Sequence, residues 1–240
     1  MGRQGFNLET AAESLLELAR ISNLDIEGIA THFATADSTD DFHGENQIKI
    51  FKNFLKEVDH DGIPYEITHA ANSAAIINVN NCELDMVRPG LMTYGVWPTD
   101  RPVHPSPLHP VARWASTLVL IKPMPGGVGI GYGRTYKTPS PQRIAMIPVG
   151  YADGYPHRLS NRSEVLVRGV RCAVRGRVSM DMISVDVSDV RDASVGDIAT
   201  LIGKDGDQEI TVEELAEKAD TIPYEILTGI GNRVERRYLQ

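Results

Sequence analysis

Tyr132 is the residue of this sequence that could most plainly do chemistry. It lies in the run Gly129-Ile130-Gly131-Tyr132-Gly133-Arg134-Thr135-Tyr136. A tyrosine has an ordinary pKa of about 10, so it becomes a useful base near neutral pH only when nearby cations lower that value. Taken alone, a Gly-Tyr-Gly run is more simply a β-turn that exposes an aromatic side chain. The neighbours along the chain decide between these two interpretations.

Three further groups of polar residues follow short apolar segments: His32, then His69 with Asn72 and Ser73, then Arg88 with Gly90 and Leu91. Arg88 carries a guanidinium, which stays protonated and cannot accept a proton. Ser73 could donate a hydroxyl, and Gly90 and Leu91 could donate two backbone N–H groups to a phosphate. The simpler alternatives are a satisfied core histidine at 32, a helix cap at Ser73 and an ordinary turn glycine at 90.

The elements that would position these groups alternate between helices and buried strands. Residues 9–20 are strong helix formers, and apolar side chains three and four apart predict an amphipathic helix over 45–58. Apolar segments at 26–34, 63–69 and 86–94 predict strands. Such alternation implies βαβ units and a parallel sheet, with the polar groups at the strands' carboxyl ends, as in a (β/α)8 barrel. Only about three barrel strands can be recognised.

The pattern changes after a proline-rich stretch at 96–110. Period-two alternation then predicts strands at Val165–Val167, Cys172–Val174 and Val178–Met182. One short helix is expected at 212–219, where Thr211 and Glu214 form a capping box. The expected organisation is a partial barrel over residues 1–100 and a mostly β domain over 111–240.

Composition narrows the class of protein. The 240 residues have 42% hydrophobic side chains and a formal net charge of −8, which argues against nucleic acid or an acidic membrane as the main partner. Cys82 and Cys172 suit neither a disulfide framework nor a zinc site, so a reducing, cytoplasmic location is the expectation. No apolar run approaches the roughly 20 residues that span a bilayer.

The order of the motifs resembles the alanine racemase family. The motifs are Thr31-His32-Phe33-Ala34-Thr35-Ala36-Asp37, His69-Ala70-Ala71-Asn72-Ser73-Ala74-Ala75, Arg88-Pro89-Gly90-Leu91-Met92-Thr93-Tyr94-Gly95, the Tyr132 run, Pro148-Val149-Gly150-Tyr151-Ala152-Asp153-Gly154-Tyr155, Gly176-Arg177-Val178-Ser179-Met180-Asp181 and Arg233-Val234-Glu235-Arg236. These seven ordered signatures with matching spacing cover essentially the whole chain. The resemblance implies a pyridoxal phosphate (PLP) enzyme that interconverts L- and D-alanine, supplies D-alanine for peptidoglycan, and combines a PLP-binding barrel with a β domain.

The same resemblance implies roles for individual residues. Tyr132 would be the base for the L-enantiomer, reaching a barrel site across a homodimer interface. Arg88 would contact the pyridine nitrogen, with His32 hydrogen-bonded beside it. A neutral ring nitrogen weakens electron withdrawal, which suits a racemase. The remaining expected cofactor residues are His69, Asn72, Ser73, Gly90 and Leu91, and the expected substrate residues are Tyr132, Tyr151, Met180, Asp181 and, with Gly2-Arg3-Gln4-Gly5 as the motif, Arg3.

Two departures from the family pattern qualify this reading. The segment with the lysine that forms a Schiff base with PLP is not recognisable, and none of the seven lysines has its context, so we expect a C-terminal portion that needs completion before it is active. Asn232 aligns where many members have a phosphate-binding tyrosine. The wider pocket that this implies leads to the hypothesis that the complete enzyme also accepts serine.

Two other classes of function stay open at this stage. One is a racemase-like fragment without catalysis that dimerises or pairs with an N-terminal partner. The other is a different PLP barrel enzyme, such as an amino-acid decarboxylase. Arg88 argues against the decarboxylase, because those enzymes generally present an acid to the ring nitrogen.

Overall fold

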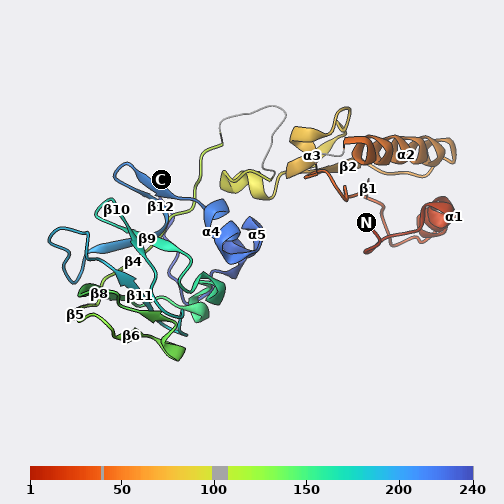
Figure 1. Ribbon diagram of the computed structural model, residues 1–240. Coiled ribbons are helices and arrows are strands. Elements are labelled where there is room, and N and C mark those ends of the chain that lie inside the picture. The colour runs from red at the N-terminus through yellow and green to blue at the C-terminus, as the bar shows by residue number, and fades with distance from the viewer. Residues whose placement is uncertain (39–40, 99–107, 240) are drawn as a thin grey trace. The chain divides into compact units, whose positions relative to one another are not determined.

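The computed structural model describes residues 1–38, 41–98 and 108–239, and the chain divides into two compact units, Met1–His109 and Pro110–Gln240 (Figure 1). Most of the proline-rich stretch predicted to separate the domains, residues 99–107, lies outside the described residues. Each unit has its own elements and is described by itself.

The first unit is built on a parallel sheet of order β1-β2-β3. Its elements are α1 (Leu8–Ala19), β1 (Gly28–Ala30), α2 (Asp41–His60), β2 (Ile67–Asn72), α3 (Ser73–Asn78), β3 (Met86–Arg88) and η1 (Leu91–Tyr94). Both predicted long helices are confirmed, and α2 is longer at each end than the expected 45–58. Its apolar face buries Ile48, Phe51, Leu55 and Val58 against the sheet, in one core with Leu15 of α1.

All three predicted strands of this unit have the wrong bounds, and the segment 26–34 forms a strand only over Gly28–Ala30. The segment 63–69 becomes a strand only at Ile67, because the Ile63 N–H still bonds to Val58 O at 3.2 Å and closes the end of α2. The segment 86–94 ends as a strand at Arg88. Pro89 has no N–H for the ladder, and η1 follows.

The second unit is mostly β, as expected. Three sheets are described: β10-β9-β12-β13 with β4 also on β12, then β11-β8-β5, and the pair β6-β7. The strands are β4 (Trp114–Thr117), β5 (Leu120–Met124), β6 (Gly129–Ile130), β7 (Tyr136–Lys137), β8 (Gln142–Ile147), β9 (Glu164–Val167), β10 (Val170–Ala173), β11 (Ile183–Asp186), β12 (Ile198–Asp205) and β13 (Gln208–Ile210). The short helices are η2 (Tyr132–Arg134), η3 (Tyr151–Asp153), η4 (His157–Leu159), α4 (Val212–Ala219) and α5 (Pro223–Gly229).

The core of this second unit is formed by strand residues that are covered on both faces. Val165, Leu166 and Val167 of β9 are all buried, and the fully buried Tyr155 donates or accepts a 2.7 Å hydrogen bond with Ser163 Oγ. The Trp114 ring meets the Tyr155 ring edge-on, with centroids 6.0 Å apart. This packing gives the loops around it a rigid base.

Helix α4 begins as predicted, with the Thr211 hydroxyl accepting the Glu214 N–H at 3.1 Å. The second half of the expected capping box is replaced, because the Glu214 carboxylate bonds to Arg171 and Lys218 instead. Helix α5 was not predicted, although Pro223 at its first turn was a signal for it.

The strand predicted over Val178–Met182 is wrong. Ser179 N–H donates to Met182 O at 3.0 Å, and Met182 N–H donates to Ser179 Oγ at 3.2 Å, so this segment turns back on itself before β11 begins at Ile183. The alternation of apolar residues thus continues through a turn. None of the helices described combines the length and the apolar character that a membrane span needs.

Candidate functional site

The carboxyl ends of the three parallel strands bring four of the predicted residues together. Ala30 of β1 is in register with His69 of β2, and Asn72 is in register with Arg88 of β3. His32 follows β1 by two residues. The predicted cluster of His32, His69, Asn72 and Arg88 therefore forms at one edge of the sheet.

Arg88 is the centre of this cluster. Its Nη2 donates to Thr31 O at 3.0 Å, to Ala70 O at 3.1 Å and to His32 Nδ1 at 3.2 Å, and its Nη1 contacts His69 Nδ1. No ion pair joins Arg88 to a carboxylate within the described residues. Its Nε–H has no acceptor in the described part of the chain, so this donor is available to a ligand.

These contacts fix the state of both histidines. A guanidinium can only donate, so the Nδ1 atoms of His32 and His69 must accept, and each ring is neutral with its proton on Nε2. Burial, and then the charge of Arg88, lower the pKa of His69. For His32, burial lowers the pKa most, followed by the charges of Arg3 and Arg88. In this tautomer His32 Nε2 carries a proton. It lies 3.4 Å from Asn72 Nδ2, which is also a donor, so the two atoms do not form a hydrogen bond.

Arg3, the most N-terminal of the predicted residues, is exposed. It lies near enough to His32 for its charge to lower that pKa. The predicted role of Arg3 as a substrate residue stays a prediction.

The expected phosphate donors lie around the loops after β2 and β3. Ser73 is buried at 2% exposure, and its Oγ accepts the Met92 N–H at 3.3 Å, leaving its own O–H free to donate. The cap of α3 is Asn72, whose Oδ1 accepts the Ala75 N–H at 2.9 Å, and not Ser73. A Cβ placed on Gly90 would meet nothing within 4 Å, so the backbone there faces open space.

One of the two expected amides is already used. The Gly90 N–H donates to Arg88 O at 2.9 Å. The Leu91 N–H, at the start of η1, has no acceptor among the described residues. A hydroxyl at Ser73 and an amide at Leu91 are therefore the donors that the loop offers.

Tyr132 lies at the tip of the β6–β7 hairpin in the second unit. Its side chain is 72% exposed, and the glycines on each side have φ values of +65° and +70°, the left-handed region that a glycine adopts without strain. Arg134, at the end of η2, also has a positive φ of 48°. This tight turn holds the phenol away from the strands and out into solvent.

A network of charges that was not predicted lies beneath Tyr151 and Met180. Asp153 is buried at 7% exposure. Arg233 donates to its carboxylate, from Nε to Oδ1 at 2.5 Å and from Nη2 to Oδ2 at 3.0 Å. Arg233 Nη2 also donates to Asp181 Oδ1 at 2.7 Å. Burial alone would raise the pKa of Asp153, but the bonds from Arg233 and from the Gly150 N–H more than offset it, and the pKa is lowered.

This network ties together three segments that are distant in the sequence. The N–H groups of Tyr151 and Ala152 donate to the carbonyls of Ser179 and Met180, each at 3.0 Å, and Gly231 N–H donates to Asp153 O at 2.9 Å. Tyr151, Met180 and Asp181 are thereby gathered on one exposed surface. Asp181 was expected to help hold a substrate carboxylate. Its own carboxylate instead pairs with Arg233, so an anion here would be held by the arginine.

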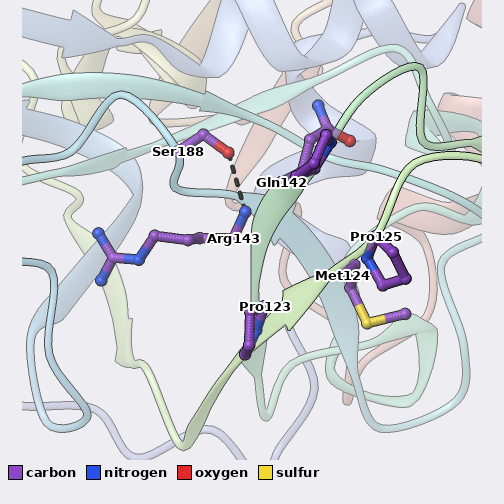
Figure 2. A pocket seen from close by; sticks show the side chains of 7 residues that line it. Pro123, Met124, Pro125, Gln142, Arg143 and Ser188 are labelled. Carbon is purple, nitrogen blue, oxygen red and sulfur yellow. Dashed lines mark hydrogen bonds between the residues drawn. The ribbon is translucent and has the colours of Figure 1, made fainter.

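Two hollows are present elsewhere. In the second unit a groove of about 570 Å³ lies over β5 and β8, where Ser188 Oγ accepts the Arg143 N–H at 2.9 Å (Figure 2). In the first unit a hollow of about 420 Å³ lies between α1, β1 and α2. Of the predicted site residues, none lines either one, so the candidate site rests on the two clusters above.

The comparisons with known proteins decide the family. The alanine racemase C-terminal domain matches residues 111–238, and the alanine racemase N-terminal domain matches residues 1–98. The chain belongs to the alanine racemase family. The predicted fold class is thereby confirmed: part of the N-terminal barrel domain of alanine racemases, followed by their C-terminal β domain.

Individual alanine racemases are similar along nearly the whole chain. The alanine racemase of Halothermothrix orenii is 46% identical over 99% of this chain, and that of Symbiobacterium thermophilum is 43% identical over the same share. The solved alanine racemase of Bacillus anthracis with bound L-Ala-P has a TM-score of 0.90 at 36% identity, covering 98% of this chain and 61% of that one. The chain spans about 63% of the length of both curated relatives.

Proposed function

We propose that the protein that carries this chain interconverts L- and D-alanine with pyridoxal phosphate. Family membership supports the reaction class, and the observation that carries the proposal is the Arg88 cluster. Among the described residues this guanidinium has no carboxylate partner, it lies between two neutral histidines, and its Nε–H has no acceptor. The similar alanine racemase structure from Bacillus anthracis has L-Ala-P bound.

The residues of the first unit fit the cofactor. Arg88 Nε–H would donate to the pyridine nitrogen, and the Ser73 hydroxyl and Leu91 N–H would donate to the phosphate beside the open space at Gly90. PLP, when bound, withdraws electrons from the substrate and makes the proton on Cα acidic. Because Arg88 cannot give up its charge, it would keep the ring nitrogen an acceptor and moderate this withdrawal, which favours returning the proton to Cα.

His32, His69 and Asn72 would act at one remove from the cofactor. The two neutral imidazoles accept from Arg88 and so hold the plane of its guanidinium. Asn72 begins α3 and so sets the direction of the chain at Ser73. These are positioning roles, which place donors without exchanging protons with the substrate.

Tyr132 would move the proton on one face of the substrate. Its phenolate oxygen would accept the Cα proton of L-alanine, and the phenol so formed would return a proton to that face in the reverse direction. The second base, a lysine in this family, is not assigned among the seven lysines. Those of the first unit, Lys49, Lys52 and Lys56, all lie on α2.

We also propose that the active site is shared within a homodimer, the Tyr132 turn of one subunit serving the Arg88 cluster of the other. Support comes from the exposure of Tyr132 at the end of its hairpin. Tyr151, Met180 and the Arg233–Asp181 pair would line the approach of the substrate, and Arg3 would add positive charge for its carboxylate.

The deciding experiment incubates the purified chain with PLP, reduces it with borohydride and measures its mass, with D-alanine formation from L-alanine assayed in parallel. A protein that is an alanine racemase forms D-alanine, and Tyr132→Phe lowers the rate by roughly 100-fold or more, as expected for loss of a general base. Arg88→Ala weakens PLP binding while the fold is kept. A mass adduct at one of the seven lysines would identify the second base. An absence of both adduct and D-alanine would leave the lysine to be supplied from outside these 240 residues.

Asn232 leads to a second substrate for the same reaction. It is exposed and adjoins Arg233, beside the substrate approach proposed above. We propose that the polar, small asparagine also admits serine. Racemisation of alanine with no racemisation of serine under the same conditions would end this idea.

A further inference from the structure

The turn that carries Tyr132 has little support of its own. The β6–β7 hairpin pairs only Gly129 with Lys137 and Ile130 with Tyr136. Its base is well fixed, because the buried Thr138 hydroxyl accepts the Val128 N–H at 2.9 Å and donates to Pro125 O at 2.7 Å. The tip, residues 131–135, lies beyond these bonds and has one internal bond, from Arg134 N–H to Gly131 O at 3.2 Å.

One side chain outside the hairpin holds this tip. Asn161 Nδ2 donates to Thr135 Oγ1 at 3.0 Å, and Asn161 Oδ1 accepts the Gly176 N–H at 2.6 Å. Among the described residues, the bond to Thr135 is the only hydrogen bond between residues 131–135 and the rest of the chain. Asn161 therefore joins the Tyr132 turn to the turn at Gly176.

The two turns also approach each other so closely that glycine is required at position 176. A Cβ on Gly176 would lie 2.7 Å from Ile130 O, whereas one on Gly131 would be in ordinary contact, 3.4 Å from Arg177 N. Ser160, beside Asn161, accepts the Val178 N–H at 2.9 Å and fixes the far side of the second turn. Asn161 itself has φ of +57°, a conformation that asparagine tolerates better than most side chains.

We propose that Asn161 is a positioning residue for Tyr132, which it holds by bridging the turns at Thr135 and Gly176. The inference rests on the proposed function for its chemical meaning, since Tyr132 must reach the Cα proton. The bridge itself is a property of the chain. A side chain that acts on a proton from an exposed turn needs such a fixed base, because small displacements of a reacting group lower the rate strongly.

The test uses three variants. Asn161→Gly removes both hydrogen bonds and adopts the positive φ without strain, so the backbone is preserved. Asn161→Asp keeps an acceptor for the Gly176 N–H and can accept from the Thr135 hydroxyl. The matched control is Asp192→Gly, an exposed residue of the same unit with φ of +56°.

Hydrogen exchange of the chain measures directly whether Asn161 stabilises the Tyr132 turn. In Asn161→Gly the amides of Arg134, which bonds within the turn, and of Gly176, which bonds to Asn161, exchange about tenfold faster, the effect of losing one to two hydrogen bonds, while those of β8 are unchanged. Asn161→Asp restores most of the protection, and Asp192→Gly leaves the turn unaffected. Unchanged exchange at 131–135 in Asn161→Gly would overturn the inference that Asn161 holds this turn.

Racemase kinetics of the protein that carries this chain test whether Asn161 positions Tyr132 for the reaction. Asn161→Gly lowers kcat about tenfold with KM within about twofold, and Asn161→Asp returns kcat to near the unmodified value. Faster exchange at the turn with unchanged kcat would overturn the role in placing Tyr132. Absence of racemisation from the unmodified protein would overturn the proposed function, and with it the role of Tyr132, while the exchange result would still decide whether Asn161 braces the turn.

Discussion

Burial, and after it the charges of nearby arginines including Arg88, keep His32 and His69 neutral, and this has a measurable effect on stability. His32 and His69 both have a folded-state pKa below the ordinary 6.5. Above pH 6.5 both rings are neutral in the folded and the unfolded chain, so this contribution to stability is fully present. As the pH falls below 6.5 the unfolded chain takes up protons first, and the contribution is lost as the pH falls through the folded pKa values.

We therefore expect the free energy of unfolding of the first unit to fall between pH of about 7.5 and about 5.5. Urea unfolding followed by Trp97 fluorescence measures it, with Trp114→Phe removing the other tryptophan. The double variant His32→Asn and His69→Asn keeps an acceptor for Arg88 at each position without a titrating ring. Its unfolding free energy should depend less on pH, and an equal dependence would contradict the assignment.

Asp153 is a second residue whose replacement should measurably lower stability. Asp153→Ala leaves the Gly150 N–H without its 2.8 Å partner, in a position that water hardly reaches. Loss of a buried hydrogen-bond partner costs about 1–3 kcal/mol, so the second unit should be destabilised by that amount in urea unfolding followed by Trp114. The exposed Asp189→Ala serves as the control and should change stability little. Equal stability of the two variants would contradict the expectation that Asp153 stabilises the second unit.

At the scale of elements, the loops beneath Tyr151 depend on close backbone approach. A Cβ on Gly154 would lie 2.1 Å from Gly229 O, and the φ there is +100°. Gly196 has a similar φ of +95° with nothing within 4 Å of the added atom. Substituting alanine at these two glycines therefore distinguishes the cost of backbone strain, which both share, from the cost of a steric clash, which only Gly154 has.

Gly196→Ala should cost about 1–2 kcal/mol, the strain of a left-handed backbone alone. Gly154→Ala should cost clearly more, because η3 must also move away from α5. Thermal and urea unfolding of the two variants give the comparison. If both lose the same stability, the clash is relieved by small shifts, and the loops are less tightly joined than the distances indicate.

Elements were predictable where one local pattern determined them. Helix α1 followed from a run of strong helix formers, α2 from apolar spacing and α4 from its cap, and the parallel order of β1, β2 and β3 followed from alternation with helices. The strand expected at Val178–Met182 failed because its backbone bonds go to Ser179 and to the distant Tyr151 loop. Such long-range partners leave no periodic signal in the sequence.

The candidate site divides in the same way. The grouping of His32, His69, Asn72 and Arg88 was predictable, since parallel strands present their carboxyl ends together. The pairing of Asp153 with Arg233 was not, because 80 residues separate them and each lies in a motif with another evident role.

At the scale of the whole molecule, the first unit exposes apolar surface beside a sheet edge. Strand β1 is an edge of the three-stranded sheet, and Phe6 and Ile50 line the hollow next to it with exposures of 57% and 41%. Open edges and apolar patches favour association between chains. We expect sedimentation of the chain to show a mass that rises with concentration.

The double variant Phe6→Ser and Ile50→Ser should reduce that rise. Replacing two apolar residues of the second unit that are more exposed than these, Val111→Ser and Val195→Ser, should not. The same reduction in both pairs would point to general hydrophobicity, and a concentration-independent mass in the unmodified chain would exclude association by this surface.

The bridge made by Asn161 has an evolutionary consequence. Its bond to Thr135 joins two side chains that are 26 positions apart, and neither atom belongs to a sheet ladder. Either residue can therefore drift without disturbing the core, but a change at one removes the selective value of the other. Homologous sequences should consequently keep or lose the amide at 161 and the hydroxyl at 135 together, and lineages that have lost both should have acquired a different support for the tyrosine turn.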